Sequence, residues 1–151
     1  MRRTGRLIPA LGVGLLAVIL MTGSALAGET RVKLVANDMQ GENEVPTPGD
    51  PDATGEARLK LDSTGRVCWQ IRVRDLTLPA TAAHIHEGDP GVPGGIVVTL
   101  SPPDANGFAE GCTRADAEVV TAIMANPAHY YVNVHNADYP GGALRDQLST
   151  S

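Results

Sequence analysis

Two histidines separated by a single residue, His84 and His86, are the side chains of this chain best placed to bind a metal ion. On a β-strand, side chains alternate between two faces, so both imidazoles lie on one face while Ile85 points to the other. Their Cβ atoms are then roughly 6.5–7 Å apart, and both rings can reach one ion at about 2.0–2.1 Å per nitrogen. The competing interpretation is two solvated histidines on the outer face of a strand.

A third histidine, His135, has the same outward parity in a second segment. Val132 and Val134 alternate with Asn133 and His135, which predicts a strand over 130–135 with its valines inward. If this strand lies beside the first, about 4.8 Å away, the three imidazoles converge. Three neutral imidazoles suit Cu(II) or Zn(II), completed by water or a carboxylate. The pattern predicts a metal site at His84, His86 and His135; the alternative is a hydrogen-bonded framework of histidines without a metal.

Other polar residues are candidates for supporting roles around this site. Asn133 is expected either to orient a histidine or to hydrogen-bond a neighbouring loop. Arg145 is a candidate guide for anions, with an ion pair to an acid such as Asp138 as the alternative. His129 lies six residues before His135, about 20 Å along a straight strand, and is expected to be a solvated residue at the strand start.

The elements that must position these residues are mostly strands. Short alternating or apolar segments are separated by Gly, Pro and Asp-rich turns, and together they predict an all-β Greek-key sandwich or barrel of about seven or eight strands, of the superoxide-dismutase-like or immunoglobulin-like kind. The expected strands cover residues 31–36, 56–61, 67–74, the H-x-H segment, 96–100, 108–112, 130–135 and 144–148.

Three segments carry more specific expectations. The run 96–100 is apolar on both faces, which favours a central strand. Residues 113–116 resemble a capping box, and the apolar residues over 119–124 repeat at helical spacing, which predicts one short helix covering an open end of the sheet. The acidic loop 37–55 lacks the spacing of a calcium loop, so we expect a solvated loop.

The first 27 residues have the pattern of a secretory signal peptide. A basic start precedes an apolar run over 7–21, and Ala25-Leu26-Ala27 forms a cleavage site, so we expect an exported protein and one domain over 28–151. Removing this segment takes away three arginines and no acids, which leaves nine basic and 17 acidic residues and a net charge of −8. That balance argues against nucleic-acid partners and, after signal cleavage, against membrane binding. It is compatible with cation binding.

Two cysteines, Cys68 and Cys112, are the other reactive pair. In an exported protein an even count favours a disulfide. Two buried free thiols and thiolate metal ligands are the alternatives. No serine lies beside a histidine as a nucleophile–base pair would require, and no paired carboxylates flank an expected cleft, so hydrolase chemistry has no support.

Five ordered blocks make the chain similar to the CHRD domain, a module named from chordin. The resemblance implies an extracellular all-β module across nearly all of 28–151 and says little about activity. Ala143 and Asp146 depart from it, because members usually carry Glu and Gly there. The blocks are G-E-N-E-V-P at 41–46, T-G-E-A at 54–57, A-H-I-H-E-G at 83–88 with its glycine-rich tail and I-V-V-T-L run, Y-V-N-V-H at 131–135 and P-G-G-A-L-R-D-Q-L at 140–148.

The histidine pattern also resembles, more weakly, copper–zinc superoxide dismutase, in which an H-x-H pair and a later histidine bind copper. This likeness carries over only to His84, His86 and His135, because the loop 88–95 contains no histidine to match the bridging residue and the zinc ligands. Three functions therefore follow as hypotheses. They are a copper protein for metal storage, delivery or protection, with zinc as the alternative ion; a redox enzyme of dismutase type; and an adhesion or protein-binding module without metal.

Overall fold

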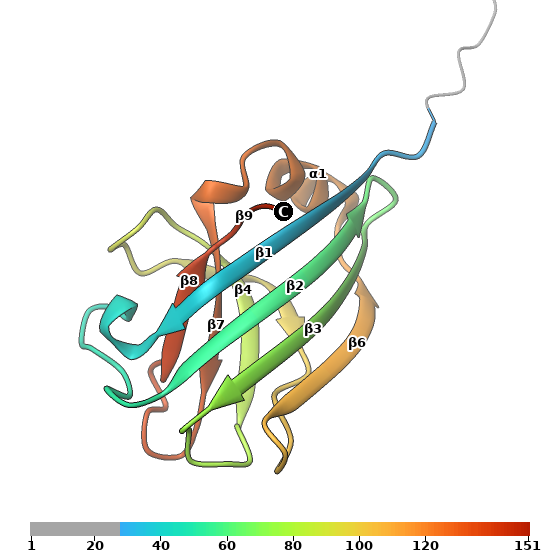
Figure 1. Cartoon of the computed structure of the whole chain (residues 1–151). Helices are drawn as coiled ribbons and strands as arrows, with labels where there is room; N and C mark the ends of the chain where they lie inside the picture. The colour runs from blue at the N-terminus through green and yellow to red at the C-terminus, as the bar shows by residue number, and fades with distance from the viewer. Residues whose placement is uncertain (1–27) are drawn as a thin grey trace, which may run out of the picture.

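The structure, a computed structural model, describes residues 28–151, and most of their regular secondary structure is antiparallel strand (Figure 1). The expected signal peptide, residues 1–27, lies outside the described residues. The elements are β1 (Arg31–Gln40), η1 (Gly41–Asn43), β2 (Thr54–Asp62), β3 (Arg66–Arg74), β4 (Ala82–Glu87), β5 (Gly95–Leu100), β6 (Phe108–Arg114), α1 (Ala117–Ala125), η2 (Pro127–His129), β7 (Tyr130–His135), β8 (Leu144–Gln147) and β9 (Ser149–Thr150).

The strands follow the order β5-β4-β7-β8-β1-β2-β3-β6, with β9 paired to β1. This path curls into two layers, so that β1, β2, β3 and β6 lie in front of β4 and β7 in Figure 1. Neighbours that are distant in sequence, β3 with β6 and β4 with β7, require the crossing connections of a Greek key. The predicted all-β sandwich or barrel with one short helix is confirmed.

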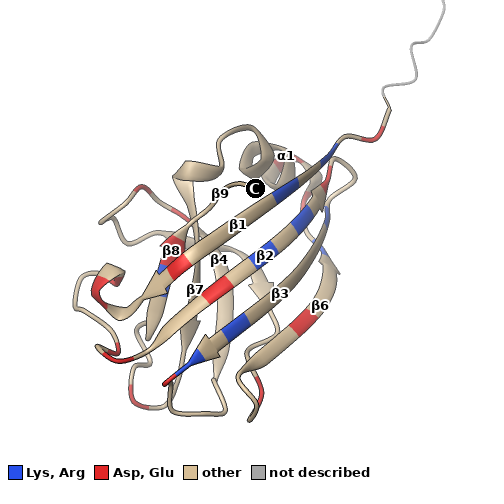
Figure 2. Ribbon diagram, in the orientation of Figure 1, with Lys and Arg blue, Asp and Glu red and all other residues tan. Residues whose placement is uncertain are grey.

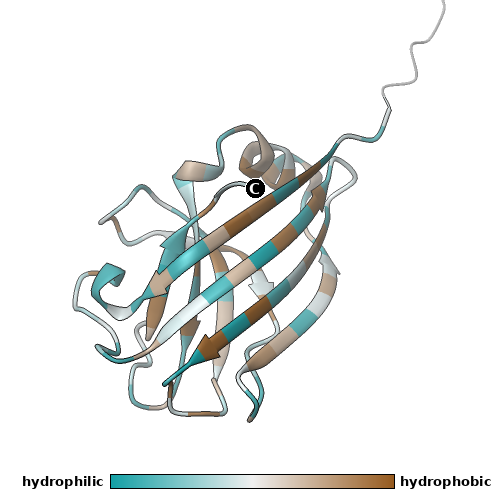
Figure 3. Ribbon diagram, in the orientation of Figure 1, coloured by the Kyte–Doolittle hydropathy of each residue, from teal (hydrophilic) through white to brown (hydrophobic). Residues whose placement is uncertain are grey.

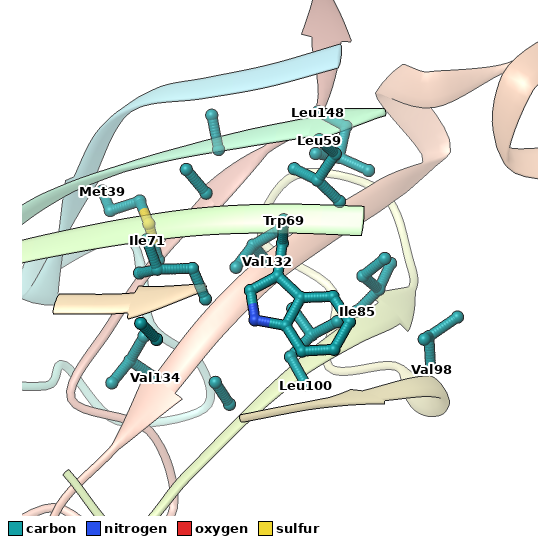
Figure 4. Packing of buried hydrophobic residues seen from close by; sticks show 14 of the residues in the cluster. Met39, Leu59, Trp69, Ile71, Ile85, Val98, Leu100, Val132, Val134 and Leu148 are labelled. Atoms are coloured by element: carbon teal, nitrogen blue, oxygen red, sulfur yellow. The ribbon is translucent and has the colours of Figure 1, made fainter. Parts of the chain in front are cut away.

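The core lies between the two layers and is built by the alternation seen in the sequence. Hydrophobic and hydrophilic bands alternate along β1, β2 and β3 (Figure 3). Trp69 of the front layer packs among aliphatic side chains of the rear layer, including Ile85 and Leu100 (Figure 4). Ile85 is fully buried, as its parity between the two histidines predicts. Each such side chain contributes about 1.5–3 kcal/mol on burial.

The expected helix is confirmed, but its start differs from the prediction. β6 continues through Arg114, and Asp116 is the N-cap, whose carboxylate accepts a hydrogen bond from the N–H of Glu118 at 2.8 Å. The helix contacts β2 and β3 and buries Val120 and Ile123 against the core. The capping-box interpretation of 113–116 was wrong because Thr113 and Arg114 are paired with β3, so the helix cap is Asp116 and not Thr113. In residues 28–151, no helix is both long and apolar enough to cross a membrane.

The predicted disulfide is confirmed. Cys68 and Cys112 occupy directly opposite positions in the β3–β6 register and are bonded to each other. The bond lies on the outward face of the front layer, where Cys112 is exposed. It therefore links the β2–β3 hairpin to the edge strand β6 and takes no part in the histidine cluster.

Two loop and strand expectations were wrong. β5 is an edge strand paired only with β4, and Ile96 on it is 56% exposed, because an apolar run alone does not show how many neighbours a strand has. β1 extends to Gln40 through a bulge after Ala36. The bulge frees the N–H of Asp38, which donates to the carboxylate of Asp146 at 3.0 Å and so ties β1 to β8.

The acidic loop between β1 and β2 is not simply solvated. Glu44 and Asp50 are 5% and 8% exposed. Asp50 accepts hydrogen bonds from the N–H groups of Asp52 and Ala53, which turns the chain back toward β2. At Gly41 an added Cβ would lie 2.0 Å from the carbonyl oxygen of Asp50, so this loop closes on itself only with glycine there.

Candidate metal site

The rear layer brings the three predicted ligands together because β4 and β7 are neighbours. His84 lies opposite Asn133 in the register, and His135 lies one step along the same face, opposite Ala82. Nδ1 of His84 and Nε2 of His135 are 3.2 Å apart. The ring of His86 lies 5.4 Å from that of His84 between centroids.

The spacing of the imidazole nitrogens approaches that of ligands to a single ion. One nitrogen from each of the three histidines lies within 4.8 Å of the others. Two nitrogens bound at about 2.0–2.1 Å to one ion are at most about 4.2 Å apart. The His84–His135 pair already satisfies this limit, and the remaining separation needs a shift of less than about 1 Å.

Backbone carbonyl groups select the tautomers of two histidines. Nδ1 of His86 lies 2.9 Å from the carbonyl oxygen of Gly94, and Nδ1 of His135 lies 3.1 Å from that of Pro140. A carbonyl oxygen only accepts, so each Nδ1 donates and each Nε2 keeps its lone pair. Nε2 of His86 is buried without a hydrogen-bond partner. These are the outer contacts that orient histidine ligands in metal sites.

The surroundings keep the three histidines neutral. Burial, followed by the neighbouring His135 and His86, lowers the pKa of His84 to about 4. Burial also lowers the pKa of His86 and of His135. Metal ions compete with protons for imidazole nitrogen, so neutral rings at pH 7 are ready to bind without losing a proton.

The glycine-rich loop after β4 covers one side of the cluster. At Gly94 an added Cβ would lie 1.7 Å from the carbonyl oxygen of Glu87, so only glycine permits this closure. The N–H of Gly94 donates to the Tyr131 hydroxyl at 3.0 Å, and the Tyr131 ring stacks on His86 at 4.9 Å. His86 is consequently 8% exposed, whereas His84 and His135 are half-buried, which leaves one side of the cluster open to solvent.

Arg145 supports that loop instead of facing solvent. Its guanidinium is stacked over the Tyr131 ring at 3.6 Å and donates to the carbonyl oxygens of Val92 and Asp89 at 3.2 and 3.3 Å. Arg145 is only 2% exposed and forms no ion pair among residues 28–151, so the alternative pairing with Asp138 was wrong. Its burial also argues against a role as an anion guide.

Asn133 lies between the histidines and a carboxylate that the sequence analysis missed. The Asn133 amide is 3.2 Å from Nε2 of His135. Burial raises the pKa of Glu44 to about 7, opposed by the charge of Arg145 and by hydrogen bonding with Asn133. One Glu44 oxygen is buried without a hydrogen-bond partner. Glu44 belongs to the block at 41–46, and that block was the only signal in an otherwise irregular loop that could have indicated it.

His129 is outside the cluster, as predicted, but it is not free of contacts. Its Nδ1 lies 2.7 Å from a carboxylate oxygen of Asp89, and its Nε2 lies 3.6 Å from Glu87. The hydrogen bond to Asp89 raises the pKa of His129. This histidine is therefore an ion-pairing residue beside the glycine-rich loop and serves as an internal control for the other three.

Fold and site together define an all-β domain, disulfide-linked, with a three-histidine cluster on the outward face of one layer. The family model described as the CHRD domain matches residues 35–148, and the chain belongs to this family of extracellular-type modules. The resemblance seen in the five sequence blocks is thus confirmed. A search of curated proteins gives no match to the chain.

Proposed function

We propose that this CHRD domain is an exported metal-binding module that holds one copper ion on His84, His86 and His135, for storage, delivery or protection. The observation that carries the proposal is the buried Nε2 of His86, which has a lone pair and no hydrogen-bond partner beside two other imidazoles. An unsatisfied buried polar atom costs about 1–3 kcal/mol, and a metal ion on this lone pair removes that cost.

The donor set favours copper over harder ions. Three imidazole nitrogens suit Cu(II) and Zn(II), and copper binds such ligands more tightly than the other divalent first-row metals. Nδ1 of His135 lies 3.1 Å from the carbonyl oxygen of Pro140, which orients that ring and leaves Nε2 free for the metal. The half-buried side of the cluster leaves room for water or an exchangeable ligand, which delivery to a partner requires.

Titration of the purified protein with Cu(II) and Zn(II), against a chelator of known affinity, tests the proposal. We expect about one equivalent of Cu(II), and His84→Ala or His135→Ala should weaken binding at least about tenfold. His129→Ala is the matched control, because it removes a histidine outside the cluster, and it should leave the affinity unchanged. Stoichiometric binding that survives replacement of all three cluster histidines would contradict the site. Absence of binding by the parent protein would favour the metal-free adhesion module.

The redox-enzyme alternative makes a different prediction about rate. A fast dismutase steers its anionic substrate with exposed positive charge, but Arg145 is 2% exposed and the charge of residues 28–151 is −8. We expect stopped-flow superoxide decay with copper-loaded protein, corrected for free copper, to be far slower than the diffusional ceiling of about 10⁸–10⁹ M⁻¹s⁻¹. A rate near that ceiling would replace the binding function with the enzyme.

A further inference from the structure

Basic side chains are concentrated on the front layer of the sandwich. Figure 2 shows the bands of Lys and Arg along β1, β2 and β3. Eight of the nine basic residues in 28–151 come from β1, β2, β3 and β6, and all eight are exposed, whereas these strands carry only four acids. The eight are Arg31, Lys33, Arg58, Lys60, Arg66, Arg72, Arg74 and Arg114. The net charge of −8 therefore conceals a positive face.

The pairing register places some of these cations directly opposite one another. Lys33 faces Lys60 across β1 and β2, and Arg66 faces Arg114 across β3 and β6. Like charges at opposite positions destabilise a sheet. The ion pairs formed within residues 28–151 do not include any of these four side chains. The chain itself leaves this repulsion uncompensated.

A shallow groove of about 1430 Å³ runs across the same face. Its walls include five of the cations and only two acids, Asp62 and Glu110. Asp62 is already engaged, since its carboxylate accepts hydrogen bonds from the hydroxyl and N–H of Thr64 and from the N–H of Arg66. Burial of Asp62 opposes these bonds, but they hold its pKa down at about 2. The five cations are Arg31, Lys33, Arg58, Lys60 and Arg66.

We propose that this groove is a binding site for an acidic polysaccharide. Cations repeat roughly every 7 Å along a strand and about 4.8 Å between strands, which presents a series of positive charges to an extended chain. Between them, Asn37, Gln70 and Thr150 line the groove with amide and hydroxyl groups suited to sugar hydroxyls. A polymer that carries both carboxylates and hydroxyl groups matches this mixture.

Other polyanions match the groove less well. A membrane surface is bound with apolar anchors, but the exposed large hydrophobic residues of 28–151 are Val92 in the β4–β5 loop and Ile96 on β5, and neither lines the groove. Single-stranded nucleic acid is bound with exposed aromatic rings, and the one aromatic residue that lines this groove, Trp69, is 6% exposed. The site also does not depend on the metal, because no residue of the histidine cluster lines it.

Calorimetric titration of the purified protein with polygalacturonate tests the proposal, with neutral dextran, phosphatidylglycerol vesicles and single-stranded DNA as parallel arms. We expect binding to polygalacturonate that weakens as salt rises, and none to dextran. The triple variant Lys33→Gln, Lys60→Gln, Arg66→Gln should lose at least about tenfold in affinity. The matched triple variant Arg72→Gln, Arg74→Gln, Arg114→Gln removes the same charge outside the groove and should stay within about threefold.

Melting curves of both triple variants check that each is folded, and copper titration checks that the rear layer is intact. Absence of polygalacturonate binding by the folded parent protein would overturn the proposal. Equal losses in the two triple variants would also overturn it, because net charge and not the groove would then be responsible. Tighter groove-dependent binding to vesicles or DNA would overturn the choice of polysaccharide.

Discussion

The two outward faces of this sandwich differ in what covers them. On the front layer, residues on the outward face of β1, β2 and β3 project into solvent and carry most of the positive charge. On the rear layer, the outward residues His86, Tyr131, Asn133 and Arg145 are all under 9% exposed, because the glycine-rich loop and the loop that contains Glu44 fold over them. Alternation is the same in both layers, but the environment is not.

This difference changes the chemistry of similar side chains. An arginine on the front layer keeps its charge in water and is available to a ligand, whereas Arg145 uses its charge to hold backbone carbonyl groups and a tyrosine ring. Histidines under the rear loops have lowered pKa values through burial, while His129 at the edge has a raised pKa through Asp89. Loop coverage, and not strand pattern, separates a neutral ligand cluster from a charged surface.

The largest expected effect is a loss of copper binding at the rear layer with no change in polysaccharide binding at the front layer. His86→Ala should lower copper affinity about a hundredfold or more, because it removes the buried ligand, and should leave polygalacturonate binding unchanged. The front-layer triple variant Lys33→Gln, Lys60→Gln, Arg66→Gln should show the reverse pattern. Calorimetry of both variants with both ligands measures this; loss of both activities in either variant would show that the faces are coupled.

Removing the disulfide tests whether the front layer can be destabilised without a change in the metal affinity of the rear layer. Replacing Cys68 and Cys112 by alanine opens a link between residues 44 positions apart and should lower the free energy of unfolding by about 2–4 kcal/mol. Urea denaturation without reductant measures the loss, and reduction of the parent protein should reproduce it. Copper affinity should be unaffected, since the bond lies on the other layer. An unchanged unfolding midpoint would mean that the disulfide contributes nothing to stability.

Glu44 gives the smallest effect and reports on the rear face alone. The pKa of Glu44 in the folded protein, about 7, lies above the ordinary value of 4.5. The free energy of unfolding is therefore highest below pH 4.5 and falls as pH rises toward 7, because the buried carboxyl resists losing its proton. Glu44→Gln should remove this loss, which is on the order of 1–3 kcal/mol. Melting temperatures of metal-free protein from pH 4.5 to 8 measure it. Glu42→Gln, an exposed neighbour, is the control; parallel curves for all three proteins would contradict a buried carboxyl.

Much of the fold and part of the site were predictable because they depend on how side chains alternate along a single strand. Alternation with a period of two predicts which residues of each strand face the core, and the H-x-H spacing predicts that both imidazoles share a face. The expected signal peptide and an even cysteine count were enough to predict the disulfide, although not its position directly across β3 and β6. These features survive in any sheet, whatever the order of its strands.

Features that depend on strand order or loop packing were not predictable. Long-range pairing places β5 at the edge of the sheet and β4 beside β7. It also brings Glu44 into contact with Asn133. Strand alternation in the sequence shows that Arg145 points outward, but only the folded loop shows that this outward face is buried. The net charge likewise does not show where the charged residues lie on the surface. Only the register brings eight cations to one layer and leaves Lys33 facing Lys60, because which charges become neighbours is decided when separate strands pair.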